Sequence, residues 1–393
     1  MSLPFKLVSA DSHIVEPPDL WKKHIDARYR DRAPGIQSGE TTDFFQCDGL
    51  TRPEGADNGI GLIATKRKYA EPDHDFGGPG RWEEVPEAGW DPAARIKEQD
   101  AEGVEAELLY TSFGLGMFAL KDEGFQYACL RAFNDWLAEF CAAAPKRLFG
   151  VGMIPTHSVE AAVAELERCA KMGMRGAMVS ISQDREHSYD QKMWTPLFRA
   201  AEDHALPISL HVAASKTSFH ATGNIFADFS CVFTPTMYTI VSMIFSGLFD
   251  RHPKLKMISV ENDAAWPLAV LERMDDRWEH DQVWARRGNF ITSGRKPSEI
   301  FHQHVGVTFM RDRTAIINRD IIGKANIMWG SDYPHFDGAW PDSAGDLLAQ
   351  FGGVPLEDQV RIGRTNAIEF YDLPIEQESG AVSGERDPGR QKT

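Results

Sequence analysis

The sequence predicts an α/β protein in which eight parallel strands alternate with helices and close into a (β/α)8 barrel. Short runs rich in Val, Ile and Leu are apolar at consecutive positions, as in strands buried on both faces of a parallel sheet. Segments of helical period separate these runs. The chain has 393 residues, enough for one barrel with insertions, because such domains take about 250 residues and can exceed about 400.

The predicted strands follow one another along the chain, and eight of them fit a closed barrel better than an open doubly wound sheet. Helix ends are readable between them: Ser158 is placed to cap VEAAVAELERCAKM, and Asp91 with Pro92 opens AARIKEQDAEG. FNDWLAEFCAAA and TPTMYTIVSMIFSGLFD are further predicted helices, the second apolar enough to be largely buried. The predicted strands span residues 5–9, 106–111, 148–154, 176–181, 207–212, 256–260, 304–309 and 327–331.

Two regions depart from this alternation. Residues 32–90 are rich in Gly, Pro, Asp and Thr, and so long an irregular insertion is usually functional or mobile. Because the insertion follows the first strand, we expect it to lie over the mouth of the barrel as a lid. Residues 375–393 form a polar tail without periodicity, which we expect to be disordered or a subunit-contact arm. Residues 1–374 are therefore predicted to form one catalytic domain.

The composition excludes several classes of protein. The chain has 42 Lys and Arg against 58 Asp and Glu, a formal charge of −16, which argues against nucleic acids and anionic membranes as partners. No apolar run approaches the roughly 20 residues that span a bilayer, and the first residues lack the pattern of a secretion signal. The five cysteines are scattered without CxxC spacing, as in reduced thiols. We expect a cytoplasmic protein that acts on a small-molecule substrate.

Polar side chains end several of the predicted strands. Asp11 and His13 stand two residues apart at the end of the first strand, so both point to the same face, into the barrel. His211 ends the fifth strand and Asp332 the eighth. A carboxylate directly after a buried strand costs stability unless something compensates it, and one cation bound by these four side chains would do so. Zn²⁺ or Mn²⁺ suits this mixed set, and Zn²⁺ is the more usual partner of two imidazoles.

Two further residues are candidates for catalysis. Glu261 ends the sixth strand, where barrels place catalytic groups, although a plain ion pair with a nearby Arg or His is the alternative. His335 lies in a Tyr-Pro-His turn just after the eighth strand, either in contact with substrate or in a solvated loop. Whether Glu16 or Glu261 touches the metal is left open. Taken alone, Asp11 and His13 would also fit a turn cap and a core imidazole.

Five segments, DSHIVEP, LHVAA, GLFDRHPKLKMISVEN, WGSDYPH and RIGRTNAIEFYDL, carry a resemblance through most of residues 5–373. They resemble the amidohydrolase-related (amidohydrolase 2) family that includes aminocarboxymuconate semialdehyde decarboxylase and the resorcylate-type decarboxylases. The resemblance implies a distorted TIM barrel of the metal-dependent hydrolase type, a homodimer, and one divalent ion held by Asp11, His13, His211 and Asp332. Where those decarboxylases carry a catalytic His after the sixth strand, this sequence reads Glu261-Asn262-Asp263.

Because that His is replaced, hydrolysis is the first functional expectation. A metal-bound water would attack a C–N, C–O or activated C–C bond of a small organic substrate, with Asp332 as general base. The alternative is a metal-dependent non-oxidative decarboxylase of an aromatic or enoic acid, in which Asp332 helps to protonate the carbon. A third interpretation is a catalytically inactive barrel that serves as a binding protein.

Overall fold

Eight parallel strands form the centre of the molecule in the computed structural model, which describes residues 3–50, 60, 80–181, 183–216, 224–281 and 290–376. Their order in the sheet follows the chain, β1-β4-β5-β6-β7-β8-β9-β10, and every neighbouring pair along it is parallel. All residues of β5 to β8 are buried, as expected for strands covered on both faces. The eight strands are β1 (Leu7–His13), β4 (Val104–Tyr110), β5 (Leu148–Met153), β6 (Gly176–Val179), β7 (Ile208–His211), β8 (Met257–Val260), β9 (Val305–Phe309) and β10 (Ile327–Trp329).

The sheet closes between its first and last strands. At this β1–β10 junction the backbone N–H of Asp332 donates to the carbonyl of Asp11 at 2.9 Å, and the N–H of His13 donates to the carbonyl of Tyr333 at 2.8 Å. Both bonds lie at the carboxyl ends of the two strands. The predicted TIM barrel is therefore confirmed as a nearly closed barrel, with its closure at the end where the candidate ligands stand.

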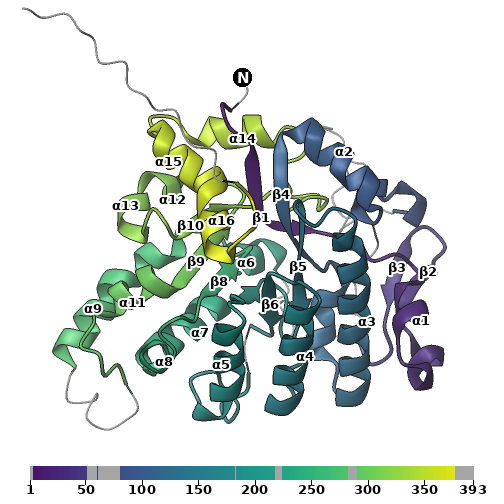
Figure 1. Cartoon of the computed structure of the whole chain (residues 1–393), viewed down its shortest axis with the longest axis horizontal. Coiled ribbons are helices and arrows are strands. Elements are labelled where there is room, and N and C mark those ends of the chain that lie inside the picture. Colours follow the sequence, from purple (N-terminus) through teal and green to yellow (C-terminus); the bar gives the residue numbers. More distant parts are fainter. Residues whose placement is uncertain are drawn as a thin grey trace, which may run out of the picture.

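Helices α2, α3, α4, α5 and α7 lie around the outside of the strands (Figure 1). The predicted caps are present, since the side chain of Ser158 accepts from the N–H of Ala161 and that of Asp91 from the N–H of Ala94. The helices are α1 (Leu20–His24), α2 (Pro92–Glu102), α3 (Glu123–Ala142), α4 (Val159–Lys171), α5 (Thr195–Asp203), α6 (Ile225–Ser230), α7 (Thr234–Phe245), α8 (Leu248–Arg251), α9 (Leu271–His280), α11 (Pro297–His304), α12 (Arg313–Ile317), α13 (Arg319–Ile322), α14 (Ser343–Gln350), α15 (Leu356–Val360) and α16 (Asn366–Tyr371). Short helical turns are η1 (Ala27–Arg32), η3 (Trp82–Glu84), η4 (Glu87–Gly89), η5 (Phe113–Ala119), η6 (Lys192–Trp194), η7 (Trp266–Ala269) and the π-helical η8 (Arg361–Thr365).

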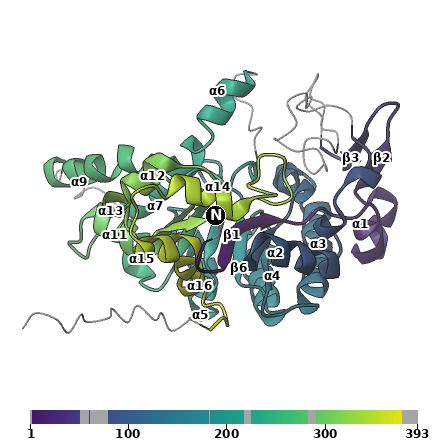
Figure 2. The same cartoon turned by 90° about the horizontal axis from the view of Figure 1, so that it is seen from above.

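Part of the predicted insertion forms a small antiparallel hairpin of β2 (Gly35–Ser38) and β3 (Asp43–Gln46). The hairpin lies to one side of the barrel, beside α1 (Figure 2). Phe45 of β3 stacks on Phe113, which follows β4, with ring centroids 4.9 Å apart. Residues 51–59 and 61–79 of the insertion, and 377–393 of the tail, lie outside the described residues. The lid therefore stays a prediction.

The first strand differs from its prediction. The apolar pattern predicts residues 5–9, whereas the strand runs from Leu7 to His13, so Asp11 and His13 lie within it and not after it. The polar residues of its second half would ordinarily end a buried strand. Here they are buried, and a register shift between Ser9 and Ser12 against β4 inserts one extra residue.

One apolar stretch reaches the length of about 20 residues that the sequence was predicted to lack. Residues Phe226–Phe245 are long and apolar enough to cross a membrane by length and composition, and 28% of the stretch is buried. In the structure a turn at Cys231–Phe233 divides it into α6 and α7. Only four of the 12 residues of α7 are buried, so the prediction that this helix is largely buried is wrong. A single such stretch is weak support for a membrane span.

Candidate metal centre

Six polar side chains meet at the carboxyl end of the barrel. They come from four places far apart in the sequence: β1 supplies two, β7 supplies one, and the turns after β8 and β10 supply the rest. Two overlapping groups have ligand atoms within 4.8 Å of one another. The first group is Asp11, His13, His211 and Glu261, and the second is His13, Glu261, Asp332 and His335.

The two imidazoles stand at the middle of this cluster. Nε2 of His13 and Nε2 of His211 are 3.2 Å apart. The carboxylate of Asp11 lies 3.6 Å from both nitrogens, and that of Glu261 lies 3.5 and 3.3 Å from them. Asp332 Oδ1 is 3.3 Å from His13 Nε2. Two ligand atoms held at about 2.0–2.2 Å from one ion, at roughly 90–110° to each other, would be about 2.8–3.6 Å apart, so these distances fit shared coordination.

The backbone helps to point the carboxylates inward. Glu261 and Asp332 have φ of 55° and 54°, in the left-handed region that non-glycine residues rarely adopt. Glu261 directly follows β8, and Asp332 stands three residues after the end of β10. The N–H of Glu261 donates to Thr308 Oγ1 at 2.9 Å. Such conformations cost about 1–3 kcal/mol each and persist where the surroundings fix them, often at functional sites.

Backbone carbonyls set the tautomer of both imidazoles. Nδ1 of His13 lies 2.7 Å from the carbonyl of Thr111, and Nδ1 of His211 lies 2.8 Å from the carbonyl of Val212. Since a carbonyl only accepts, each Nδ1 carries the hydrogen and each Nε2 presents a lone pair to the centre. This is the arrangement in which histidines bind a metal while a carbonyl behind the ring orients it.

The charges of the cluster also fit a cation. Asp11, His13, His211 and Asp332 are at most 1% exposed, yet Asp11 Oδ1, Glu261 Oε2 and both oxygens of Asp332 accept no hydrogen bond within the described part of the chain. Burial, reinforced by the neighbouring carboxylates, raises the pKa values of Glu261 and Asp332 well above their usual range. Three carboxylates, of which Asp11 and Asp332 are buried and Glu261 is 21% exposed, together with two imidazole lone pairs fit the donor set of a divalent ion.

The two imidazoles respond to this field in opposite directions. Burial lowers the pKa of His13 well below its usual value, and the neighbouring rings of His335 and His211 lower it further. Burial also acts to lower the pKa of His211, but Asp11 and Glu261 outweigh it and raise that pKa. The carboxylates of Asp11 and Glu261 therefore favour a positive charge at His211 over one at His13.

Asp332 and His335 form a pair beside this centre. His335 Nδ1 lies 2.9 Å from Asp332 Oδ1, and its ring stacks on His13 with centroids 3.9 Å apart. His335 Nε2 lies 2.8 Å from the hydroxyl of Ser112, which donates its own hydrogen to the carbonyl of Ile14 at 2.6 Å. Ser112 must therefore accept from His335, so Nε2 carries the hydrogen.

In neutral His335, Nδ1 consequently presents a lone pair toward Asp332 Oδ1. Burial lowers the pKa of His335 to about 4 and raises that of Asp332, and both shifts favour a proton on Asp332 over one on His335. The side chain of His335 is 12% exposed, which answers the question left by the sequence: it lies in the site and not in a solvated loop.

Glu16 lies apart from the cluster. It is buried and accepts hydrogen bonds from Thr111 Oγ1 and from the N–H groups of Phe113 (3.0 Å) and Gly114 (3.1 Å). Its contacts fix the turn after β4.

Sequence reasoning missed Thr111 and Ser112, which orient His13 and His335. For Ser112 the signal available was a hydroxyl residue just after an apolar strand, whereas Thr111 orients His13 through its backbone carbonyl, which no side-chain pattern signals.

Comparison with known proteins gives the family. The model of the family described as amidohydrolase (Amidohydro_2) matches residues 81–373. A gamma-resorcylate decarboxylase of Rhizobium sp. (strain MTP-10005) is 27% identical over 335 residues, covering 80% of this chain and 98% of that protein.

Solved structures share the fold. An amidohydrolase from Mycobacterium avium subsp. paratuberculosis K-10 superposes with a TM-score of 0.77 at 22% identity, covering 94% of this chain and 100% of that one. A 5-carboxyvanillate decarboxylase from Novosphingobium aromaticivorans DSM 12444, with bound manganese, gives 0.69 at 18% identity, with 94% and 98% covered. The resemblance read from the sequence is confirmed: this chain belongs to the amidohydrolase family.

Proposed function

We propose that the protein is a metal-dependent, non-oxidative decarboxylase of a hydroxylated aromatic acid. The observation that carries the proposal is the buried carboxyl of Asp332 beside the predicted metal centre, 2.9 Å from His335; burial raises the pKa of this carboxyl. A decarboxylase needs a proton donor at the carbon that loses CO₂, and a buried carboxylic acid is such a donor. Relatives that match almost along their whole length are named decarboxylases.

The metal would be held by His13, His211, Asp11 and Glu261, with Asp332 at its edge. Mn²⁺ and Zn²⁺ both accept this set of imidazoles and carboxylates. Mn²⁺ gains support from the manganese named in the carboxyvanillate decarboxylase structure. When bound, the ion supplies Lewis-acid binding of the substrate's carboxylate and its neighbouring phenolic oxygen.

The chain's own residues would then move one proton. Asp332 gives its proton to the ring carbon that bears the carboxylate. The C–C bond breaks, its electron pair restores the aromatic ring, and CO₂ leaves. Ser112 holds the His335 ring through Nε2, which keeps Nδ1 facing Asp332, and a proton from solvent restores the carboxylic acid of Asp332 before the next turnover. The His that the sequence lacks after β8 is thus replaced in function by Asp332 with His335.

Hydrolysis, the first expectation from the sequence, is the less supported reaction. It needs Asp332 as a base, and burial beside Asp11 favours the protonated form. The relatives named in the comparison also favour the decarboxylase. The two reactions differ in what enters the product, since hydrolysis incorporates oxygen from water and decarboxylation incorporates a hydrogen.

The test supplies the Mn²⁺-loaded protein with 2,6-dihydroxybenzoate and 5-carboxyvanillate, with benzoate as a control that lacks the neighbouring hydroxyl. We expect CO₂ release from at least one phenolic acid and none from benzoate. In D₂O the product should carry one deuterium at the vacated ring position. Incorporation of ¹⁸O from water into products of an amide and lactone panel, with no CO₂ from the phenolic acids, would establish hydrolysis instead.

A further inference from the structure

We infer that Arg95 is a positioning residue for the metal centre, acting through the backbone of the strand that carries His13. The inference rests on the metal site of the proposed function, and nothing in the sequence motifs pointed to Arg95. Its guanidinium is fully buried, on α2, outside the barrel and behind β1. A buried Arg without metal or substrate to bind needs a structural reason for its position.

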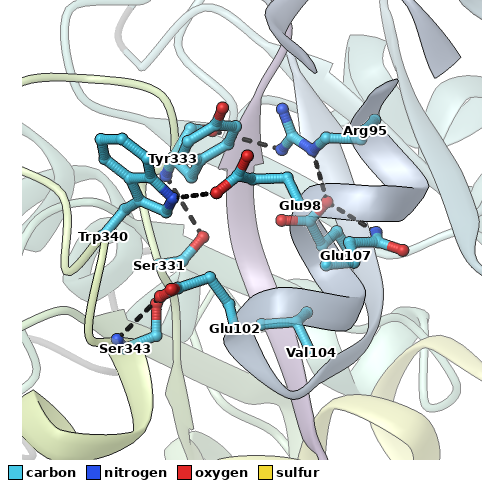
Figure 3. A pocket seen from close by; sticks show the side chains of 10 residues that line it. Arg95, Glu98, Glu102, Val104, Glu107, Ser331, Tyr333, Trp340 and Ser343 are labelled. Atoms are coloured by element: carbon cyan, nitrogen blue, oxygen red, sulfur yellow. Dashed lines mark hydrogen bonds and ion pairs between the residues drawn. The ribbon is translucent and has the colours of Figure 1, made fainter. Parts of the chain in front are cut away.

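The guanidinium joins β1 to the turn that follows β10. Arg95 Nη1 donates to the carbonyl of His13 at 2.8 Å, and Nη2 donates to the carbonyl of Tyr333 at 3.3 Å. Figure 3 shows Arg95 reaching between Tyr333 and Glu107. His13 is a predicted ligand, and Tyr333 directly follows Asp332. Both carbonyls therefore belong to the peptide units that carry or adjoin the site.

A carboxylate fixes the guanidinium from the other side. Arg95 Nε donates to Glu107 Oε2 at 2.6 Å. Glu107 on β4 is itself held by Gln99 Nε2 at 2.7 Å and by the hydroxyl of Ser12 at 3.0 Å. Because all four of these residues are buried, the planar fork of Arg95 has one position available.

This fork acts where the sheet ladder ends. At the β1–β10 junction the N–H of His13 also donates to the carbonyl of Tyr333, so Tyr333 and His13 are linked both directly and through Arg95. The same junction sets the 3.3 Å between His13 Nε2 and Asp332 Oδ1. Loosening it changes the spacing of ligands from two strands without removing any ligand.

The chain offers a matched control on the same strand, β4. Arg364 of η8 is buried and forms an ion pair with Glu105, two residues before Glu107 on β4. Arg364 also donates to the carbonyl of Glu376 at 3.1 Å. Both arginines are thus buried, paired with β4 carboxylates and bonded to backbone carbonyls. Arg95 differs in that its carbonyl partners are His13 and Tyr333, at the site.

The experiment measures Mn²⁺ affinity of the full chain, without substrate, by the EPR signal of free Mn²⁺. The variants are Arg95→Lys, Glu107→Gln and the control Arg364→Lys. Removing a group that orients a ligand typically costs about 10–100-fold in metal affinity, and we expect that loss for Arg95→Lys and a smaller one for Glu107→Gln. Arg364→Lys should stay within about threefold of the wild type. Thermal unfolding of the metal-free proteins and the EPR line shape of bound Mn²⁺ are recorded for each.

Three results overturn the inference: wild-type Mn²⁺ affinity in Arg95→Lys, an equal loss of affinity in Arg364→Lys and Arg95→Lys, or failure of both Arg95→Lys and Glu107→Gln to fold while Arg364→Lys folds. If Arg95→Lys alone fails to fold, Glu107→Gln decides by the same comparison with the control. A wild-type protein that binds no Mn²⁺ overturns the proposed metal site itself. One that binds Mn²⁺ but releases no CO₂ overturns only the decarboxylase.

Discussion

The pairing of Asp332 with His335 shows how the surroundings of a side chain decide what it can do. A solvated Asp would be ionised at neutral pH, with a pKa of about 4. Asp332 is 1% exposed and faces Asp11, and both conditions favour its neutral form. His335 cannot take the proton because burial disfavours its charged form. Both shifts favour a proton on Asp332 over one on His335, as the proposed reaction requires.

Asp332→Asn tests that acid. The amide keeps the shape and an oxygen for the metal but cannot donate the proton to carbon, so CO₂ release at saturating Mn²⁺ should fall by about 10²–10⁴-fold. The measurement is kcat together with the Mn²⁺ content of the variant. Asp320→Asn, at an exposed carboxylate on α13, is the control and should retain wild-type turnover. Full turnover by metal-loaded Asp332→Asn would remove Asp332 from the mechanism.

His335 should make the stability of the metal-free protein depend on pH. Burial lowers its pKa to about 4, while the unfolded chain has the ordinary value of about 6.5. Between these values the unfolded chain binds more protons, so the free energy of unfolding rises with pH and the contribution is lost as pH falls through this window. The full effect is at most about 3 kcal/mol.

Urea unfolding in the presence of a chelator, from pH 4.5 to 7.5, measures this dependence. His335→Gln should flatten the pH profile relative to the wild type, because the titrating ring is gone. His302→Gln removes an exposed imidazole and should leave the profile unchanged. Parallel profiles for the wild type and His335→Gln would contradict the assigned pKa.

At the scale of elements, apolar runs predicted the positions of the strands, except for β1, whose second half consists largely of polar residues. Seven strands were predicted to within about three residues at each end, because Val, Ile and Leu at consecutive positions are typical of strands buried on both faces. The end of β1 was missed because Ser9, Asp11, Ser12 and His13 break the apolar pattern. These side chains are buried because they bond to one another and to the site, for example Ser12 to Ser331 at 2.7 Å.

Gly330, directly after β10, lies close against Asp11 of β1. A Cβ placed there would lie 2.5 Å from Cβ of Asp11 and 3.1 Å from its carbonyl oxygen. Gly330→Ala should therefore push β1 away at a predicted ligand, lower stability by about 1–3 kcal/mol and weaken Mn²⁺ binding by about tenfold or more. Denaturant unfolding and Mn²⁺ titration measure the two effects.

Gly352→Ala is the control for this substitution. Its Cβ would meet only the end of the flexible Arg313 side chain, at 3.5 Å. We expect little change in stability and none in Mn²⁺ affinity. If Gly330→Ala bound Mn²⁺ as tightly as the wild type, the close approach of β10 to Asp11 would not set the geometry of the site.

At the scale of the whole molecule, the candidate residues could be named from the sequence but their grouping in space could not. Asp11, His13, His211 and Asp332 could be named because each polar side chain ended an apolar strand. Glu261 lies within ligand distance of both imidazoles of the centre, of which Asp332 groups with His13 alone. This difference depends on backbone turns and distances in space, which no local sequence pattern predicts. The role of Arg95 could not be predicted for the same reason, since its partners come from three separate segments. The homodimer and the cytoplasmic location stay predictions.

Metal binding should stabilise the whole barrel, because the ligands come from β1, β7 and the turn after β8 and meet only in the native state. At a free concentration of about 100 times Kd, Mn²⁺ would add about 2.7 kcal/mol, which for a chain of this size raises Tm by roughly 3 °C. The double variant His13→Ala/His211→Ala should lose this shift, whereas His280→Ala, at an exposed imidazole, should keep it. Differential scanning calorimetry with and without Mn²⁺ measures all three. An equal shift in the double variant would mean that the ion binds elsewhere, because neither imidazole would then be needed to hold it.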